Sequence, residues 1–170
     1  MGVQVRLAMC EDVPSIHEIY NDAIINTTAV YNYEPVTLEH QIRWFETKQQ
    51  QNFPVFVAED TTGVVGFSSY GSFRAWPAYL HTVENTVYVH PQRRGQGIGK
   101  LLIPPLIEAA IAQRMHAIVA GIDATNIASI RLHTYFGFVQ VAHFKEVGFK
   151  FNRWLDLVFM ELLFSFPDLP

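Results

Sequence analysis

Cysteine, charge and long hydrophobic runs are all scarce in this sequence. The single cysteine, Cys10, excludes an internal disulfide and is typical of a reducing compartment. Charged residues make up only 16%, and the net charge of −4 argues against a general nucleic-acid or membrane-surface binder. No apolar run is long enough to span a bilayer. We therefore expect a soluble, cytoplasmic protein that binds neither nucleic acid nor membrane.

The sequence is, by contrast, rich in hydrophobic residues that can form a core. Hydrophobic residues make up 49% of the 170 residues, which excludes a disordered chain and is enough for one core. No repeat, linker or low-complexity tract interrupts it. We expect one domain over residues 1–170. The histidines lack the spacing of metal ligands, so we expect no metal.

Hydrophobic periodicity and turn residues predict strands that alternate irregularly with helices. The expected strands cover 3–8, 54–59, 64–73, 83–89, 117–122, 138–144 and 154–163. The expected helices begin after Asp12 and at about 38, 98 and 126. This order fits an α/β (α+β) fold, with a mixed, twisted, mostly antiparallel sheet of about seven strands and helices on both faces.

Several local features are also predicted. Asp12 is the expected N-cap of the first helix, and Ile42 and Phe45 are expected to face inward from the second. Prolines at 104–105 predict a kink in the third helix, or a helix shorter than its pattern. A bend that contains Gly148 is expected to join the last two strands.

The most informative segment covers residues 86–100. A β-branched strand ends at Pro91, three glycines follow, and an apolar-periodic segment then opens a helix. Glycines allow the backbone to approach a ligand closely, and the free N–H groups of a helix N-terminus favour negative charge. Arg93 and Arg94 add two cations. This segment predicts a phosphate-binding turn.

Two common phosphate motifs do not fit this turn. A Rossmann fingerprint, G-x-G-x-x-G, would need glycine where Lys100 stands. A P-loop, G-x-x-x-x-G-K-[ST], would need glycine at Arg94 and a hydroxyl at Leu101. Both nucleotide motifs are therefore excluded.

A third pattern does fit. Residues 92–97, Gln-Arg-Arg-Gly-Gln-Gly, resemble the pyrophosphate loop Q/R-x-x-G-x-G/A of the GNAT superfamily of N-acetyltransferases. Residues 126–138 resemble that superfamily's N-x-x-A-x-x-L-Y-x-x-x-G-F helix, with His133 in place of the tyrosine. Residues 81–91, His133 and the tail 147–156 resemble its phosphinothricin and methionine sulfoximine acetyltransferase group. The resemblance covers nearly the whole chain.

This resemblance implies a GNAT-like fold and acetyl-CoA as co-substrate. It implies transfer of acetyl to the α-amino group of a small amino-acid analogue, directly within a ternary complex, and it implies a homodimer. Two alternatives stay open, an acetyltransferase for protein or peptide N-termini and a non-catalytic acyl-CoA-binding module.

Glu84 and His133 are the candidate catalytic residues. Glu84 precedes the cofactor loop on the same strand and matches the group's proposed general base, although a solvent-exposed acid at a strand edge is the other reading. His133 either gives a proton to the departing sulfur, assists the base, or only packs against the cofactor.

The remaining candidate residues bind the two substrates. The candidate cofactor contacts are Val87, Tyr88, Val89, Arg94, Gly95, Gln96, Gly97, Ile98, Gly99, Asn126 and Ser129, with a backbone N–H of 87–89 as oxyanion donor. Arg74 suits an acceptor carboxylate, and aromatic residues around it suit a small pocket: Phe73, Trp76 and Tyr79. An ordinary surface salt bridge is the other reading of Arg74. The aromatic tail 149–154 serves a dimer interface, a partner's pocket or the core.

Overall fold

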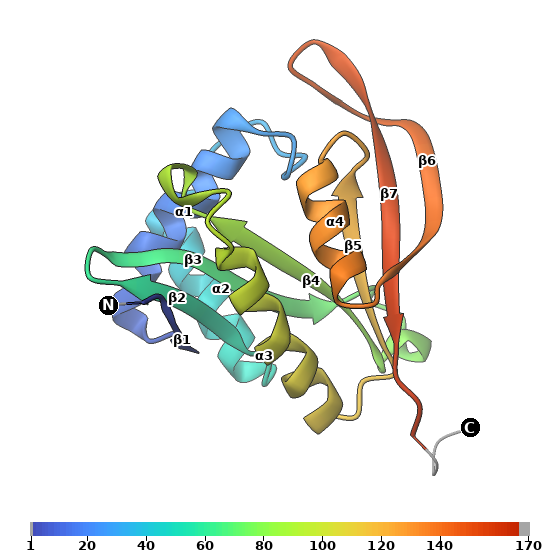
Figure 1. Cartoon of the computed structure of the whole chain (residues 1–170), viewed down its shortest axis with the longest axis horizontal. Coiled ribbons are helices and arrows are strands. Elements are labelled where there is room, and N and C mark those ends of the chain that lie inside the picture. Colours follow the sequence, from blue (N-terminus) through green and yellow to red (C-terminus); the bar gives the residue numbers. More distant parts are fainter. Residues whose placement is uncertain (1, 167–170) are drawn as a thin grey trace. The chain divides into compact units, whose positions relative to one another are not determined.

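The computed structural model describes residues 2–166, which form seven strands and four α-helices. In chain order these are β1 (Gln4–Leu7), α1 (Val13–Asn26), α2 (Leu38–Gln50), β2 (Val55–Asp60), β3 (Gly63–Ser72), β4 (Thr82–Val89), α3 (Ile98–Ala112), β5 (Ala117–Asp123), α4 (Ile127–Tyr135), β6 (Val139–Lys150) and β7 (Arg153–Leu163) (Figure 1).

The strands form one sheet in the order β1-β2-β3-β4-β5-β7-β6. β4 and β5 pair in parallel, whereas β1–β2, β2–β3, β5–β7 and β6–β7 pair antiparallel. The predicted mixed, mostly antiparallel sheet of about seven strands is confirmed.

Contacts within residues 2–166 group the chain into two compact units. The first unit runs up to Tyr70 and includes Thr86–Leu106, and the second comprises Gly71–Asn85 and the chain from Ile107 onward. Strand β4 is divided between them after Asn85. The expectation of one domain over residues 1–170 stays a prediction.

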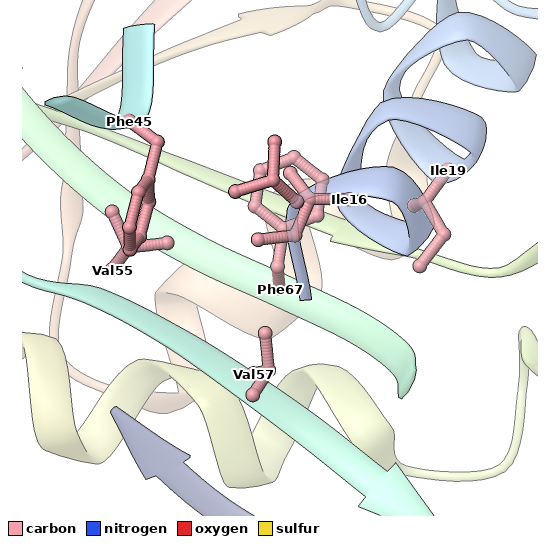
Figure 2. Close-up of a cluster of buried hydrophobic side chains, with 7 residues drawn as sticks. Ile16, Ile19, Phe45, Val55, Val57 and Phe67 are labelled. Carbon is pink, nitrogen blue, oxygen red and sulfur yellow. The ribbon is translucent and has the colours of Figure 1, made fainter. Parts of the chain in front are cut away.

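In the first unit, helices cover both faces of β2 and β3. Val57 of β2 packs with Phe67 of β3, Ile16 of α1 and Phe45 of α2 (Figure 2). The next residue, Ala58, packs instead with Ile98 and Leu102 of α3. Because consecutive strand residues point to opposite faces, α1 and α2 lie on one face and α3 on the other.

The start of α1 confirms the predicted N-cap position, but not a capping role for its side chain. Asp12 occupies the N-cap position of α1, but its side chain makes no capping hydrogen bond there. It accepts hydrogen bonds from the backbone N–H of Met9 at 2.7 Å and from Arg6 at 2.7 and 2.9 Å. Arg6 also binds Glu59 of β2 at 2.6 Å. The hydrogen bond from Arg6 holds the pKa of Asp12 below its usual value. This carboxylate therefore connects β1 to the start of α1.

The inward face of α2 is partly different from the prediction. Phe45 is buried as expected, but Ile42 is 42% exposed and Gln41 is buried in its place. The buried stripe therefore runs through Gln41, Phe45 and the half-buried Lys48, at the i, i+4 and i+7 spacing of one helix face. Lys48 donates to the Tyr70 carbonyl at 2.8 Å, and burial lowers its pKa to about 8.

Helix α3 continues through Pro104 and Pro105 to Ala112. Its approach to the sheet depends on Gly66 of β3. A Cβ atom at Gly66 would lie 3.0 Å from the Tyr88 carbonyl oxygen and 3.2 Å from both Ile98 Cγ2 and Leu102 Cδ1. Since these atoms are backbone and core, any side chain at this position would force closely packed atoms between the sheet and the helix to shift.

In the second unit, β6 and β7 form a long hairpin whose turn was predicted in the wrong place. Gly148 lies inside β6 and pairs with Leu155. The chain reverses at Phe151 and Asn152, with φ angles of 50° and 57°. Two-residue hairpin turns of this kind need positive φ at both central residues, and asparagine tolerates this better than most side chains. The glycine was the stronger local signal, but strand pairing extends beyond it.

Candidate active site

The glycine-rich turn of the first unit has the predicted order of strand, turn and helix. A 3-10 turn, Pro91–Arg93, follows β4, and α3 begins at Ile98. Gly95 and Gly97 have φ angles of 77° and 81°, a region that L side chains rarely adopt. A Cβ atom on either glycine would meet nothing within 4 Å. Conformation, not crowding, therefore requires glycine, and the space above the turn is open to a ligand.

The two arginines of the turn are held in place by acidic residues. Arg93 pairs with Asp60 at 3.1 Å, and Arg94 pairs with Asp22 of α1 at 2.6 Å. Arg94 Nε also donates to the Val89 carbonyl at 3.2 Å. A guanidinium has five N–H donors, so these contacts fix its position without exhausting it.

The end of β4 and the rest of the turn are also ordered by packing. Val87 and Val89 pack on the α3 side of the sheet. Tyr88 lies with its ring centroid 5.5 Å from Tyr20 and 5.3 Å from Phe67 on the other side. Gln96 Nε2 donates to the Gln92 carbonyl at 3.2 Å. Side chains of 87–89 are thus used for packing, which leaves their backbone as the part suited to a ligand.

In the second unit, Glu84 lies on the face of the sheet that also carries Gly121. Glu84 pairs in parallel with Val119, two residues before Gly121, so the three side-chain positions share a face. Arg74 Nη1 lies 3.8 Å from Glu84 Oε2. Burial raises the pKa of Glu84, and Arg74 partly opposes this. The carboxylate is thus a stronger base than an ordinary surface glutamate.

A row of aromatic rings begins beside Arg74. The guanidinium carbon of Arg74 is 4.1 Å from the ring centroid of Phe73. The ring centroid of Phe73 lies 5.6 Å from that of Tyr79 and 6.1 Å from that of Phe159 of β7. The centroid of Phe159 in turn lies 5.8 Å from that of Phe144 of β6, and all three contacts are edge to face. Of the predicted substrate residues, the structure brings three together: Phe73, Arg74 and Tyr79. The fourth, Trp76, is 74% exposed.

His133 contacts the opposite face of the same strand, through Asn85. Asn126 caps α4 by accepting from the Ser129 N–H at 3.1 Å. One turn later, His133 Nδ1 lies 2.8 Å from the Ser129 carbonyl oxygen. Its Nε2 lies 3.1 Å from Asn85 Nδ2. The imidazole is thus held between the helix backbone and β4.

These two contacts define the protonation of His133. A carbonyl oxygen can only accept, so Nδ1 carries the proton and donates to Ser129. In neutral imidazole Nε2 then has no proton and accepts from the Asn85 amide. Burial lowers the pKa of His133, which favours this neutral form, although the bond to Ser129 opposes the shift. Both ring nitrogens are therefore occupied.

Two predicted catalytic residues are thus separated by the strand itself. Glu84 and Asn85 are consecutive in β4 and point to opposite faces, and His133 is on the Asn85 side. The predicted joint action of Glu84 and His133 has no direct contact to support it.

The sequence reasoning missed three residues at these places. Asn85 is a polar residue at an inward position of an apolar strand, and its Oδ1 is buried without a hydrogen-bond partner among residues 2–166. Gly121 is an isolated glycine within an apolar strand, a signal of close approach. Asp22, the partner of Arg94, has no local signal because it is far away in the sequence.

Chemically, these features can do two things. The glycine turn and helix N-terminus suit an anion such as a diphosphate. The Glu84–Arg74 pair offers a base of raised pKa next to a cation suited to a carboxylate. Within residues 2–166 no cluster of three or more His, Cys, Asp or Glu side chains forms a metal site, and no helix is long and apolar enough to cross a membrane.

Comparison with known proteins agrees with these features. The model of the acetyltransferase (GNAT) domain matches residues 5–159. An L-methionine sulfoximine/L-methionine sulfone acetyltransferase of Pseudomonas aeruginosa is 46% identical, with 95% of each chain covered. A phosphinothricin N-acetyltransferase of Streptomyces coelicolor is 38% identical, covering 94% of this chain and 95% of that one.

Solved structures show the same fold. An acetyltransferase structure from Salmonella typhimurium with its cofactor acetyl-CoA has a TM-score of 0.97 and 40% identity, covering 100% of this chain and 98% of the other. A ribosomal-protein-alanine N-acetyltransferase of Brucella melitensis has a TM-score of 0.92 and 45% identity, covering 95% and 99%. By its sequence and its fold, the chain belongs to the GNAT family of acetyltransferases.

Proposed function

We propose that this enzyme transfers the acetyl group of acetyl-CoA to the α-amino group of a small amino-acid analogue of the methionine sulfoximine, methionine sulfone or phosphinothricin type. The relatives described above support this substrate class. The observation that carries the proposal is the Glu84–Arg74 pair.

The spacing of this pair matches the charges of an α-amino acid. Glu84 Oε2 and Arg74 Nη1 are 3.8 Å apart. An α-amino acid has its ammonium and carboxylate on one carbon, so one molecule can place the ammonium at Glu84 and the carboxylate at Arg74. A peptide N-terminus has an amide in place of that carboxylate and makes no ion pair with Arg74. The pair therefore favours free amino acids.

Each residue then has a defined task. Glu84 takes a proton from the acceptor ammonium, directly or through one water, so that the nitrogen lone pair becomes available. Arg74 fixes the acceptor by its carboxylate. A backbone N–H within 87–89 stabilises the negative charge that develops on the acetyl oxygen, a contribution of about 3 kcal/mol. Transfer is direct, within a ternary complex.

The glycine turn is proposed to hold acetyl-CoA, which supplies the acetyl thioester. The positive φ angles of Gly95 and Gly97 and the open space above them fit a diphosphate at the start of α3. Backbone N–H groups of 95–99 and the guanidinium of Arg94 are the donors, with Asp22 fixing the arginine. Asn126 and Ser129 are proposed to contact the pantetheine arm.

We propose a positioning role for His133. Its Nδ1 proton is used by Ser129 and its Nε2 lone pair by Asn85, which supports this role over donation to the departing sulfur or assistance to the base. It is proposed to hold Asn85 and the cofactor-binding helix α4 in place.

A homodimer is also proposed, through the β6–β7 hairpin. This hairpin exposes more large apolar side chains than an isolated surface normally shows: Val139, Val141, Phe144, Val147, Phe149, Phe151 and Trp154. A cytoplasmic location likewise remains a prediction.

The base is tested by Glu84→Gln. We expect turnover with methionine sulfoximine to fall roughly 100-fold or more at pH 7.5, because general-base catalysis is lost, while acetyl-CoA affinity stays unchanged. Thiol release measures the turnover, and isothermal titration calorimetry measures the acetyl-CoA affinity. The acidic limb of the wild-type kcat/KM profile, set by a raised Glu84 pKa, should disappear. Glu161→Gln is the control, since Glu161 pairs with Val119 from β7 and lies on the same face. Unchanged turnover in Glu84→Gln would remove Glu84 as the base.

The acceptor class is tested by Arg74→Gln. We expect the KM for methionine sulfoximine and phosphinothricin to rise by about 10- to 100-fold, as a charged hydrogen bond is lost. Amino-acid amides and peptides should be poor acceptors for the wild type. Arg43→Gln, which removes only an exposed i, i+4 ion pair with Glu39, should change nothing. Better turnover with peptides than with amino acids would favour the peptide N-terminal alternative, which the Brucella melitensis relative represents.

The role of His133 is tested by ¹⁵N NMR of histidine-labelled protein. We expect the His133 signals to show the Nδ1–H neutral tautomer at pH 7–8, since burial lowers its pKa. The variant His133→Gln, which lacks these signals, provides the assignment. An imidazolium at neutral pH, or an Nε2–H tautomer, would contradict the positioning role.

The dimer is tested by sedimentation velocity. We expect the wild type to sediment as a dimer and Trp154→Glu to dissociate, because burying an unpaired charge in an apolar interface is costly. Trp76→Glu, at an exposed tryptophan outside the β6–β7 hairpin, should stay dimeric. A monomeric wild type would exclude the proposal.

A further inference from the structure

Gly121 is a glycine whose backbone does not need one. It lies in the middle of β5, opposite Phe159 of β7 in a regular antiparallel ladder. It is absent from the positive-φ glycines of residues 2–166, which are Gly63, Gly95, Gly97 and Gly137. Glycine is also disfavoured inside strands, where it has the most conformational freedom to lose and no side chain to pack. Its presence here therefore needs another reason.

That reason is the space next to it. A Cβ atom at Gly121 would lie 3.0 Å from Glu84 Oε1, 3.3 Å from Phe159 Cε1 and 3.8 Å from Leu157 Cδ1. The closest atom is thus the carboxylate oxygen of Glu84, and the second is a ring edge of the aromatic row. Both of these contacts are tighter than a Cβ atom normally makes, so the neighbouring atoms would have to shift by a few tenths of an ångström beside a methyl group.

Gly66 offers a direct contrast. A Cβ atom there meets the Tyr88 carbonyl, Ile98 and Leu102, which are backbone and core atoms that cannot move cheaply. At Gly121 the atom that must move is the end of a flexible side chain. Substitution of Gly66 therefore disturbs the fold, whereas substitution of Gly121 disturbs mainly the position of the Glu84 carboxylate.

We propose that Gly121 is a positioning residue for the Glu84 base, because the absence of its side chain lets the carboxylate lie over β5. This inference rests on the proposed role of Glu84. A methyl group at Gly121 forces the carboxylate to a new position. The displacement needed is a few tenths of an ångström. Since a base misplaced by about 1 Å loses on the order of 100-fold in rate, this smaller displacement costs roughly 3- to 10-fold.

The test is Gly121→Ala, assayed by thiol release with methionine sulfoximine and by thermal unfolding. We expect kcat to fall roughly 3- to 10-fold, while the KM for acetyl-CoA stays unchanged. The unfolding midpoint should be unchanged or higher, because alanine is better accommodated in a strand. Gly66→Ala, the same substitution at the contrasting glycine, should lower the midpoint. Wild-type turnover in Gly121→Ala would overturn the inference.

A double-mutant cycle with Glu84→Gln separates positioning from other causes. If Gly121 acts through the carboxylate, adding Gly121→Ala to Glu84→Gln should cause little further loss, because there is no base left to misplace. If the turnover losses of the two single variants multiply in the double variant, Gly121 acts on something other than the carboxylate. That result would overturn the inference but leave the proposed function intact. Full activity of Glu84→Gln alone would instead refute the base itself, and the inference with it.

Discussion

Strand geometry at β4 is the constraint on which the catalytic features depend. Because consecutive side chains of a strand point to opposite faces, Glu84 and Asn85 cannot serve the same surface. Glu84 lies beside Arg74 and Gly121, and Asn85 lies against His133 of α4. A step of one residue along the strand thus separates the Glu84 carboxylate, which has a raised pKa, from the neutral His133 imidazole, whose two nitrogens are both hydrogen-bonded.

Glu84 and His133 also differ in chemical character, because each has different hydrogen-bond and charge partners. The hydrogen bonds of His133 are saturated by a backbone carbonyl and an amide, and its burial disfavours a charge. Glu84 is also shifted by burial, but a partly exposed arginine keeps it able to ionise. Burial therefore keeps His133 neutral and makes Glu84 a stronger base. Desolvation acts on both groups, so the difference comes from the groups that each one contacts.

Local patterns predicted most of the fold. The strands lie close to their predicted ranges, and the positive-φ glycines 95 and 97 form the predicted turn. Errors arose where pairing or packing overrides local preference. Gly148 was the stronger turn signal, yet the ladder between β6 and β7 extends to Lys150. Ile42 was preferred by its hydrophobicity, but the angular position of Gln41 decides which side chain is buried.

The candidate site was predictable in part. Glu84, Arg74 and the glycine turn follow from motifs that lie close together in the sequence. The contact between Asn85 and His133 joins two distant segments, and the tautomer of His133 depends on which atoms surround it. Gly121 could be recognised as unusual within its strand, but its purpose requires the position of a carboxylate from another strand. Long-range juxtaposition is what a single sequence does not contain.

The irregular pairing of β6 has a consequence for solubility. Among residues 2–166, β6 is the last strand of the sheet, so no strand of this range lies on one side of its backbone. Such edges promote aggregation by strand addition. Its register shifts between Gln140 and Ala142 and between Phe144 and Gly148. Each irregularity twists the edge and interrupts its row of hydrogen-bonding groups. The strand can therefore display apolar side chains for a specific contact without offering a straight template on which fibrils grow.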